Sequence, residues 1–135
     1  MAQDKESQPF ALLDGHNFMA LTTYRKSGAP VVTPVWFAQS GETLYVRTEG
    51  NSGKAKRLRH TPRVMVGPCD ARGTLLGGTV EAQARFLTPE EVPTARRAFR
   101  RKYNVQALFF EILGRVTGRR KNEVFLAITP AAATP

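Results

Sequence analysis

The sequence is poor in the residues that form covalent cross-links and catalytic nucleophile pairs. It has one cysteine, Cys69, and two histidines, His16 and His60, among its 135 residues. A single cysteine excludes an internal disulfide and suits a reducing cytoplasm, and we expect Cys69 to be a small buried strand residue. The two histidines have no metal-ligand spacing and form no recognisable pair with a cysteine or an acid. The sequence therefore predicts no metal site and assigns no catalytic acid or base.

Long hydrophobic runs are also missing. No segment is apolar over the length that a membrane-spanning helix needs, and the first ten residues, MAQDKESQPF, lack the apolar core of a signal peptide. We therefore expect a cytoplasmic protein with no membrane span. The hydrophobic content of 41% is ordinary for a globular domain, and neither a repeat nor a linker divides the chain. The sequence predicts one domain over residues 1–135, with frayed tails at 1–8 and 130–135.

Acidic residues are scarce relative to basic ones. The chain has 11 Asp and Glu against 20 Lys and Arg, which gives a formal net charge of +9 at pH 7. The basic residues cluster around 47–63, 96–102 and 115–121. Such a field attracts polyanions, and nucleic acid, acidic lipid and a multiply charged cofactor all qualify. Charge alone therefore does not select a partner.

Short runs with alternating polarity predict an antiparallel sheet over most of the chain. The expected strands are 18–24, 31–38, 43–48, 63–69, 79–87 and 123–129. A helix is expected to open with Thr88 as its N-cap and Pro89 at its first position, and a second helix is expected over 106–116. Six short strands with few helices predict a mainly β (α+β) fold, a small closed or split β-barrel.

The most unusual stretch is GNSGKAKRLRHTPRV, residues 50–64, in which two lysines, three arginines and a histidine follow a turn of small residues. A P-loop needs the pattern G-x-x-x-x-G-K-[ST]. Thr48 stands where its first glycine would be, and Ala55 stands where the magnesium-binding hydroxyl would be. The stretch is therefore not part of a nucleotide-hydrolysing P-loop.

The same stretch can form a short helix with an anion at its start. Asn51 or Ser52 can cap a helix that begins near Gly53 and ends before Pro62. The N-terminus of such a helix suits a phosphate. Lys54 would lie in the first turn, where a cation is unfavourable unless an anion is bound. The alternative interpretation is a solvated basic face on a surface helix.

Two further blocks carry irregular features. Pro34 interrupts the run VTPVWF, and a proline inside a strand predicts an edge or a local irregularity. Backbone freed beside Trp36, the only tryptophan, can receive a flat ring, although a core tryptophan on an edge strand is equally consistent. The block CDARG predicts a turn that carries Asp70 and Arg72, for which a solvated ion pair is the common explanation.

Taken in order, the blocks VTPVWF, SGKAKRL and CDARG resemble the pyridoxamine-phosphate-oxidase-like split-barrel flavoproteins. They are most similar to the branch of F420-dependent oxidoreductases, and the resemblance runs from about residue 18 to the last strand. It implies a homodimer of six-stranded antiparallel split β-barrels, with a helical insertion before the last strand. It also implies a flavin or deazaflavin in a groove at the subunit interface. The arginine and histidine set by which pyridoxamine-phosphate oxidases proper grip pyridoxal phosphate is absent, so oxidation of vitamin B6 is not expected.

The resemblance also implies which residues bind the cofactor. Those expected along the ring are Thr33, Pro34, Val35 and Trp36, with Thr48 near the polar edge of the ring. Those expected at the phosphate are Ser52, Gly53, Lys54, Lys56 and Arg57. Arg72 is expected to approach the cofactor from the other subunit.

The leading hypothesis from the sequence is an F420-dependent oxidoreductase that transfers a hydride between the deazaflavin ring and an unsaturated or conjugated small molecule. FMN is the alternative cofactor. The basic residues around 96–102 and 115–121 favour F420, because its oligoglutamate tail would use them. A non-enzymatic cofactor-binding protein and a basic nucleic-acid-binding barrel are further alternatives. We expect no nucleic-acid partner, because the strands lack the exposed aromatic pairs on which bases stack.

Overall fold

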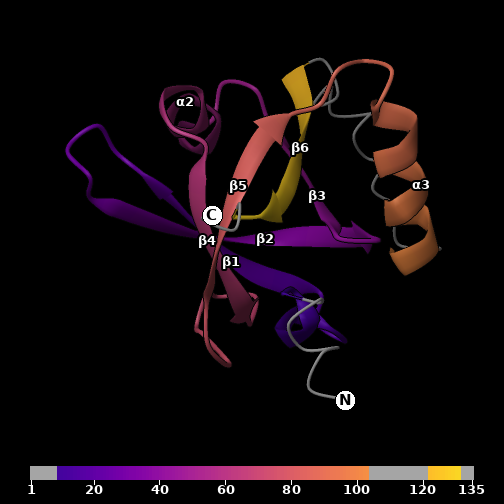
Figure 1. Cartoon of the computed structure of the whole chain (residues 1–135), viewed down its shortest axis with the longest axis horizontal. Helices are drawn as coiled ribbons and strands as arrows, with labels where there is room; N and C mark the ends of the chain where they lie inside the picture. The colour runs from indigo at the N-terminus through magenta and orange to yellow at the C-terminus, as the bar shows by residue number, and fades with distance from the viewer. Residues whose placement is uncertain (1–8, 104–121, 132–135) are drawn as a thin grey trace.

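The computed structural model describes residues 9–103 and 122–131, and six antiparallel strands form a closed barrel within them (Figure 1). The strands are β1 (Phe18–Tyr24), β2 (Pro30–Ser40), β3 (Thr43–Glu49), β4 (Arg63–Cys69), β5 (Val80–Phe86) and β6 (Glu123–Pro130). The helices are the 3-10 helix η1 (Ala11–Leu13), α2 (Gly53–His60) and α3 (Val92–Tyr103). The strand order is β1-β2-β3-β6-β5-β4, and β4 pairs with β1 to close the barrel. The predicted six-stranded antiparallel barrel is confirmed.

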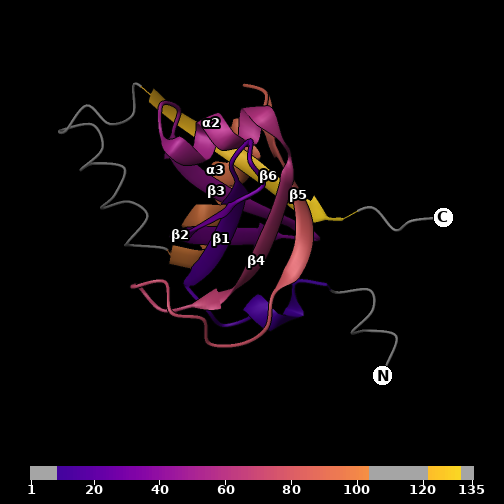
Figure 2. The same ribbon diagram turned by 90° about the vertical axis from the view of Figure 1, so that its left-hand side faces the viewer.

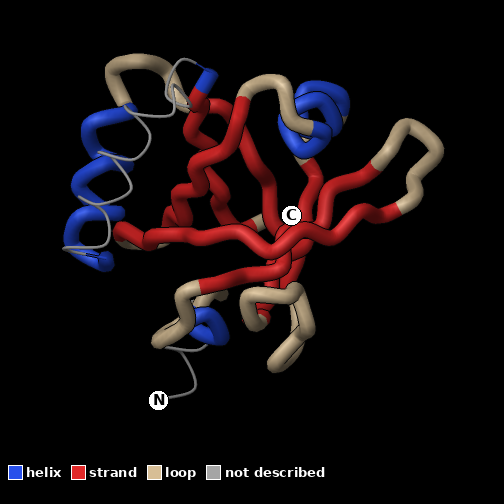
Figure 3. Tube along the Cα trace, turned by 180° about the vertical axis from the view of Figure 1, so that it is seen from behind, coloured by secondary structure: helices blue, strands red, loops and turns tan. Residues whose placement is uncertain are grey.

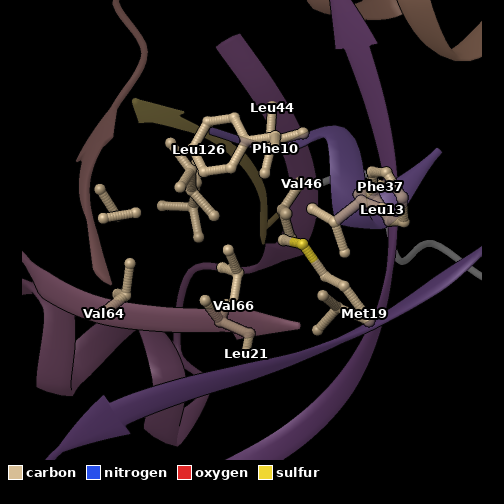
Figure 4. Close-up of a cluster of buried hydrophobic side chains, with 14 of the residues drawn as sticks. Phe10, Leu13, Met19, Leu21, Phe37, Leu44, Val46, Val64, Val66 and Leu126 are labelled. Atoms are coloured by element: carbon tan, nitrogen blue, oxygen red, sulfur yellow. The ribbon is translucent and has the colours of Figure 1, made fainter. Parts of the chain in front are cut away.

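The interior of the barrel is one apolar core. Alternate residues of each strand point inward, and Figure 4 shows Met19 of β1 and Val66 of β4 among them. Leu13 of η1 and Leu58 of α2 belong to the same core. Because η1 and α2 lie at opposite ends of the barrel (Figures 1 and 2), they close the two ends that the strands leave open.

Helix α2 begins and ends as the sequence predicts. Ser52 is its N-cap, and the Ser52 Oγ accepts a hydrogen bond from the backbone N–H of Ala55 at 3.2 Å. Ala55 and Leu58 are the buried residues of the helix. Thr61 follows as the C-cap directly before Pro62. Local capping and spacing were therefore sufficient to place this helix.

Helix α3 begins later than the sequence predicts. Its first residue is Val92, and Thr88 and Pro89 belong to the turn before it. The carboxylate of Glu91 accepts two hydrogen bonds from the guanidinium of Arg85, at 2.8 and 2.6 Å, and one from the backbone N–H of Thr88 at 2.9 Å. The Thr88 hydroxyl also donates to Glu91. These bonds hold the turn closed, so the predicted N-cap role of Thr88 is wrong.

The last strand extends one residue into the predicted C-terminal tail. Pro130 is the last residue of β6, so the tail predicted over 130–135 was placed too early. Residues 1–8 and 132–135, and the helix expected over 106–116, lie outside the described residues. Among the helices that the structure describes, none is long and apolar enough to cross a membrane.

A second apolar cluster lies outside the barrel, under α3. The apolar residues of α3 recur at helical spacing, and Ala95, Phe99 and Tyr103 are buried on one side of the helix. They pack on Ala38 of β2 and Phe125 of β6. Figure 3 shows α3 beside the strands on which it packs. This packing fixes the position of α3 relative to β2, which matters for the cavity described next.

Candidate functional site

Strand β2 changes its partner halfway along its length. Residues 30–36 pair with β1, whereas the pairing with β3 begins only at Phe37. Among the described strands, the first half of β2 therefore has one open edge. Pro34, which has no N–H to donate, lies in this half, and the predicted edge position is confirmed.

A cavity of about 320 Å³ lies beside this part of β2. The described residues that line it are Pro34, Val35, Trp36, Arg47, Lys54, Phe99 and Tyr103. The cavity thus brings Lys54 of α2 to the strand on which the flat ring was expected. Arg47, Phe99 and Tyr103 were not predicted as site residues.

Stacked aromatic rings form one wall of the cavity. Trp36 stacks on Tyr103 with 5.0 Å between ring centroids and 19° between planes, and Tyr103 stacks in turn on Phe99 at 5.7 Å. The Tyr103 hydroxyl donates to the carbonyl oxygen of Phe37 at 2.5 Å. Burial raises the pKa of Tyr103 to about 12, so the hydroxyl stays protonated and keeps this bond. The bond ties α3 to β2 and holds Tyr103 against the indole of Trp36.

The first turn of α2 contains backbone donors next to the cavity residue Lys54. The first N–H groups of a helix have no acceptor within it. The Ser52 Oγ satisfies the N–H of Ala55, and the first bond of the helix itself runs from the N–H of Lys56 to the Ser52 carbonyl at 3.1 Å. Within the helix, the amides of Gly53 and Lys54 are therefore left for an external acceptor. The Thr48 Oγ1 lies 3.3 Å from the Ser52 Oγ and links the end of β3 to the cap.

Basic side chains surround this first turn. Arg57 donates from Nε to the Thr23 Oγ1 at 2.6 Å, and its Nη1 would lie 2.8 Å from a Cβ added at Gly53, so the guanidinium rests against the start of the helix. Burial and the charge of Arg57 lower the pKa of Lys54. Burial and the charge of Arg25 lower the pKa of Arg57. Since a helix N-terminus is itself positive, these cations are unfavourable here unless an anion is present. We call the amides of Gly53 and Lys54, with the side chains of Lys54 and Arg57, the anion cradle.

The predicted site residues do not all reach the cavity. Pro34, Val35, Trp36 and Lys54 line it. Gly53, Arg57, Ser52 and Thr48 surround the first turn of α2 beside Lys54. Thr33 is half-buried on β2, and Lys56 is exposed on α2.

Arg72 is exposed in the turn after β4. The Asp70 Oδ1 accepts the backbone N–H of Arg72 at 2.9 Å, so this carboxylate shapes the turn. Gly73 of the same turn lies beside Pro34, because a Cβ added there would be 3.5 Å from the Pro34 Cδ. The turn thus contacts the open half of β2 in its own chain, and an approach of Arg72 to a partner's cofactor stays a prediction.

The single cysteine is buried, and one of the two histidines lies on the surface. Cys69 is 3% exposed, and burial raises the pKa of its thiol, so the expected buried strand residue is confirmed. His60 is the exposed last residue of α2. In the part of the chain that the structure describes, no group of three or more His, Cys, Asp or Glu side chains could hold a metal ion.

Arg47, Phe99 and Tyr103 line the cavity but were not predicted as site residues, although sequence patterns indicate part of their placement. In β3 the buried residues Leu44 and Val46 alternate with Arg47, which places Arg47 on the outer face of the barrel. In α3 the helical spacing of Phe99 and Tyr103 marks an apolar stripe. Neither signal says that α3 covers the outer face of β2 and β3, so the three residues could not be brought together from the sequence.

The chain matches one protein family over almost its whole length. The sequence profile described as pyridoxamine 5'-phosphate oxidase matches residues 5–134. No curated protein matches in sequence. Similar solved structures include the heme storage protein HutZ from Vibrio cholerae, with 15% identity, a TM-score of 0.65, and 98% of this chain and 90% of that chain covered.

Two further solved structures share the fold. A FAD-binding protein from Mesorhizobium loti has 18% identity and a TM-score of 0.62, with 98% of this chain and 89% of that chain covered. An F420 reductase has 18% identity and a TM-score of 0.55, with 91% and 93% covered. At these identities the likeness shows the fold alone. Because the family profile spans nearly the entire sequence and the barrel agrees with it, the chain belongs to the pyridoxamine 5'-phosphate oxidase family.

Proposed function

We propose that the chain binds coenzyme F420 in the cavity beside β2 and acts as an F420-dependent oxidoreductase. The observation that carries this proposal is the position of Lys54, a half-buried cation in the first turn of α2 that lines the same cavity as the open half of β2. When bound, the deazaflavin supplies hydride transfer to or from an unsaturated or conjugated small molecule. Membership of a family of flavin-binding oxidoreductases supports the class of reaction.

The residues of the site fit a phosphate joined to a flat ring. The anion cradle offers two backbone amides and two basic side chains to the phosphate. Pro34 and Trp36 offer an apolar surface to the ring, and Tyr103 holds the indole in place. The described residues of the cavity wall are apolar, aromatic or basic, and they can bind and orient a cofactor and exclude water from it.

FMN is the second candidate, and the contacts of α3 favour it. The basic residues of this helix were expected to bind the F420 tail, but several are engaged within the chain. Arg96 pairs with Glu123 at 3.3 Å, and the Arg101 Nη2 donates to the Ser40 Oγ at 3.3 Å. Lys102 donates to a backbone carbonyl of β2 at 2.8 Å, and burial lowers its pKa to about 8. FMN, with a single phosphate, needs only the anion cradle.

Titration of the purified apo-protein with F420 and with FMN separates the two candidates. We still expect F420 to bind at least about tenfold more tightly than FMN, a difference of about 1.4 kcal/mol, because the chain has a formal net charge of +9, which attracts the several negative charges of the oligoglutamate tail. Trp36 is the only tryptophan, so quenching of its fluorescence reports on binding in this cavity. Equal affinities, or FMN that co-purifies, would favour FMN. A chain that binds F420 but does not oxidise its reduced form with any conjugated acceptor would be a cofactor-binding protein without turnover.

The same proposal includes a homodimer with twofold symmetry. Val32, on the open half of β2, and Leu75 and Leu76, on the loop after β4, are large apolar residues that are at least half exposed. Exposed apolar residues of this kind favour burial against a second copy. We expect light scattering at micromolar concentration to give the mass of a dimer. A monomer that still binds its cofactor would contradict a site shared between subunits.

A further inference from the structure

Two arginines share one carboxylate beside the cavity. The Arg47 Nε lies 3.5 Å from the Glu123 Oε2, and the Arg96 Nη2 lies 3.3 Å from the Glu123 Oε1. The three side chains are largely buried, with exposed fractions of 21% for Arg47, 24% for Arg96 and 15% for Glu123. Among the described residues, Arg47 and Arg96 thus contact the same carboxylate in surroundings that screen charge poorly.

Arg47 is the member of this group that faces the cavity. It belongs to the cavity wall, whereas Arg96 lies over the ring of Phe125, with 5.1 Å between its Cζ and the ring centroid. The Arg47 Cζ lies 5.4 Å from the centroid of Phe99 and 5.9 Å from that of Phe125. Two aromatic rings thus hold the guanidinium in place at the edge of the cavity.

The contact of Arg47 with Glu123 is loose. Its 3.5 Å exceeds the usual length of a charge-assisted hydrogen bond, about 2.7–2.9 Å. The same chain shows a tight pair for comparison, because the guanidinium of Arg85 meets the carboxylate of Glu91 at 2.6 and 2.8 Å. Arg47 therefore keeps hydrogen-bonding capacity for a second carboxylate.

The cavity has a second positive group at another point of its wall. Lys54 belongs to the anion cradle, which the phosphate of the cofactor would occupy. Arg47 comes from β3 and is held by Glu123 and Phe99, so it is a separate position for an anion. The stacked rings of Trp36, Tyr103 and Phe99 belong to the same cavity wall, and aromatic surfaces of this kind favour contact with flat conjugated groups.

We propose that Arg47 is a specificity-determining residue and that the substrate is a planar conjugated carboxylic acid. The carboxylate of the acid pairs with the guanidinium of Arg47, and its conjugated part lies against Phe99 and Tyr103, while the cofactor ring covers Pro34 and Trp36. The planar fork of a guanidinium suits bidentate recognition of a carboxylate. This inference rests on the proposed function, because it names the substrate class for the same site.

The test compares an acid with its neutral isostere on the apo-protein. Calorimetry would give the dissociation constants of trans-cinnamate and cinnamamide, and Trp36 fluorescence would show that both bind in this cavity. We expect cinnamate to bind at least about tenfold more tightly than the amide. Arg47→Met should reduce the affinity for cinnamate to that of the amide. Glu123→Gln removes the competing carboxylate and should tighten cinnamate binding while it leaves the amide unchanged.

Control variants test whether the preference for the acid depends on Arg47 itself. Arg85→Met removes a guanidinium from an exposed pair outside the cavity wall and should leave both affinities unchanged. Lys54→Ala should weaken cofactor binding more than cinnamate binding. If Arg47→Met does not fold, as judged by circular dichroism, the inference is tested by whether Glu123→Gln tightens the binding of cinnamate but not of cinnamamide. Equal binding of acid and amide by the parent, or an acid preference that survives Arg47→Met, would overturn the inference.

The titrations with F420 and FMN distinguish this inference from the proposed function. A parent protein that binds a cofactor but does not prefer the acid would reject Arg47 as the specificity residue and leave the cofactor proposal intact. A parent that prefers the acid through Arg47 but binds neither cofactor would reject the proposed function.

Discussion

Lys54→Ala is expected to weaken cofactor binding by about 1.5–3 kcal/mol, the usual contribution of a hydrogen bond to a charged group. The melting temperature of the apo-protein should stay unchanged or rise slightly. Without a bound anion, the Lys54 ammonium is half-buried beside Arg57 and lies at the positive end of α2. Its removal therefore relieves repulsion in the apo-protein and removes a partner from the bound phosphate. Fluorescence titrations and apo melting curves measure the two effects.

Two variants of the same helix serve as controls. Lys56 is exposed on α2, and Lys56→Ala should change binding less than Lys54→Ala. The Arg59 guanidinium donates to the Gly50 carbonyl at 2.9 Å and lies over the ring of Phe86 at 5.2 Å. Arg59→Ala should therefore lower stability and change binding least. A Lys54→Ala protein that binds as tightly as the parent would show that residues 50–64 form only a solvated basic face.

Features that depend on neighbouring residues in the sequence were predictable. Helix α2 follows from a serine cap and from the spacing of Ala55 and Leu58. Strand β5 follows from its alternation, since Ala82 and Ala84 are buried and Glu81 and Gln83 are exposed. In both cases the physical cause lies within a few residues, so one sequence is enough to recognise it.

Features that depend on tertiary contacts were not predictable. The predicted start of α3 was too early because Arg85, on β5, and Thr88 both donate to the carboxylate of Glu91 and hold the residues before Val92 in a turn. Arg47 enters the cavity wall because α3 packs over the outer face of β3, and Phe99 then lies under its guanidinium. The basic residues of α3 were predicted to bind the cofactor's tail, but several of them bind groups of the same chain. A cluster of charges in the sequence does not show which cations are paired in the folded protein.

The largest expected loss of stability comes from a glycine that the sequence interpretation did not single out. Gly67 is buried in β4 and pairs with Ala20 of β1. A Cβ added there would lie 2.4 Å from the carbonyl oxygen of Gly78 and 2.9 Å from the Cγ2 of Thr79. Both belong to the segment that leads from the turn after β4 into β5. Since one clashing atom is backbone, Gly67→Ala must displace this segment, and we expect a loss of about 1–3 kcal/mol in unfolding free energy.

Gly78→Ala is the matched control for this prediction. It alters the other side of the same contact, but a Cβ at Gly78 would have no atom within 4 Å, so its melting temperature should stay near that of the parent. Gly67→Ala should also weaken cofactor binding, because the displaced segment continues directly from the turn in which Gly73 rests against Pro34 of the cavity wall. Thermal melts and cofactor titrations of both variants test the two effects. A Gly67→Ala protein as stable as Gly78→Ala would mean that the segment moves freely and does not support the open half of β2.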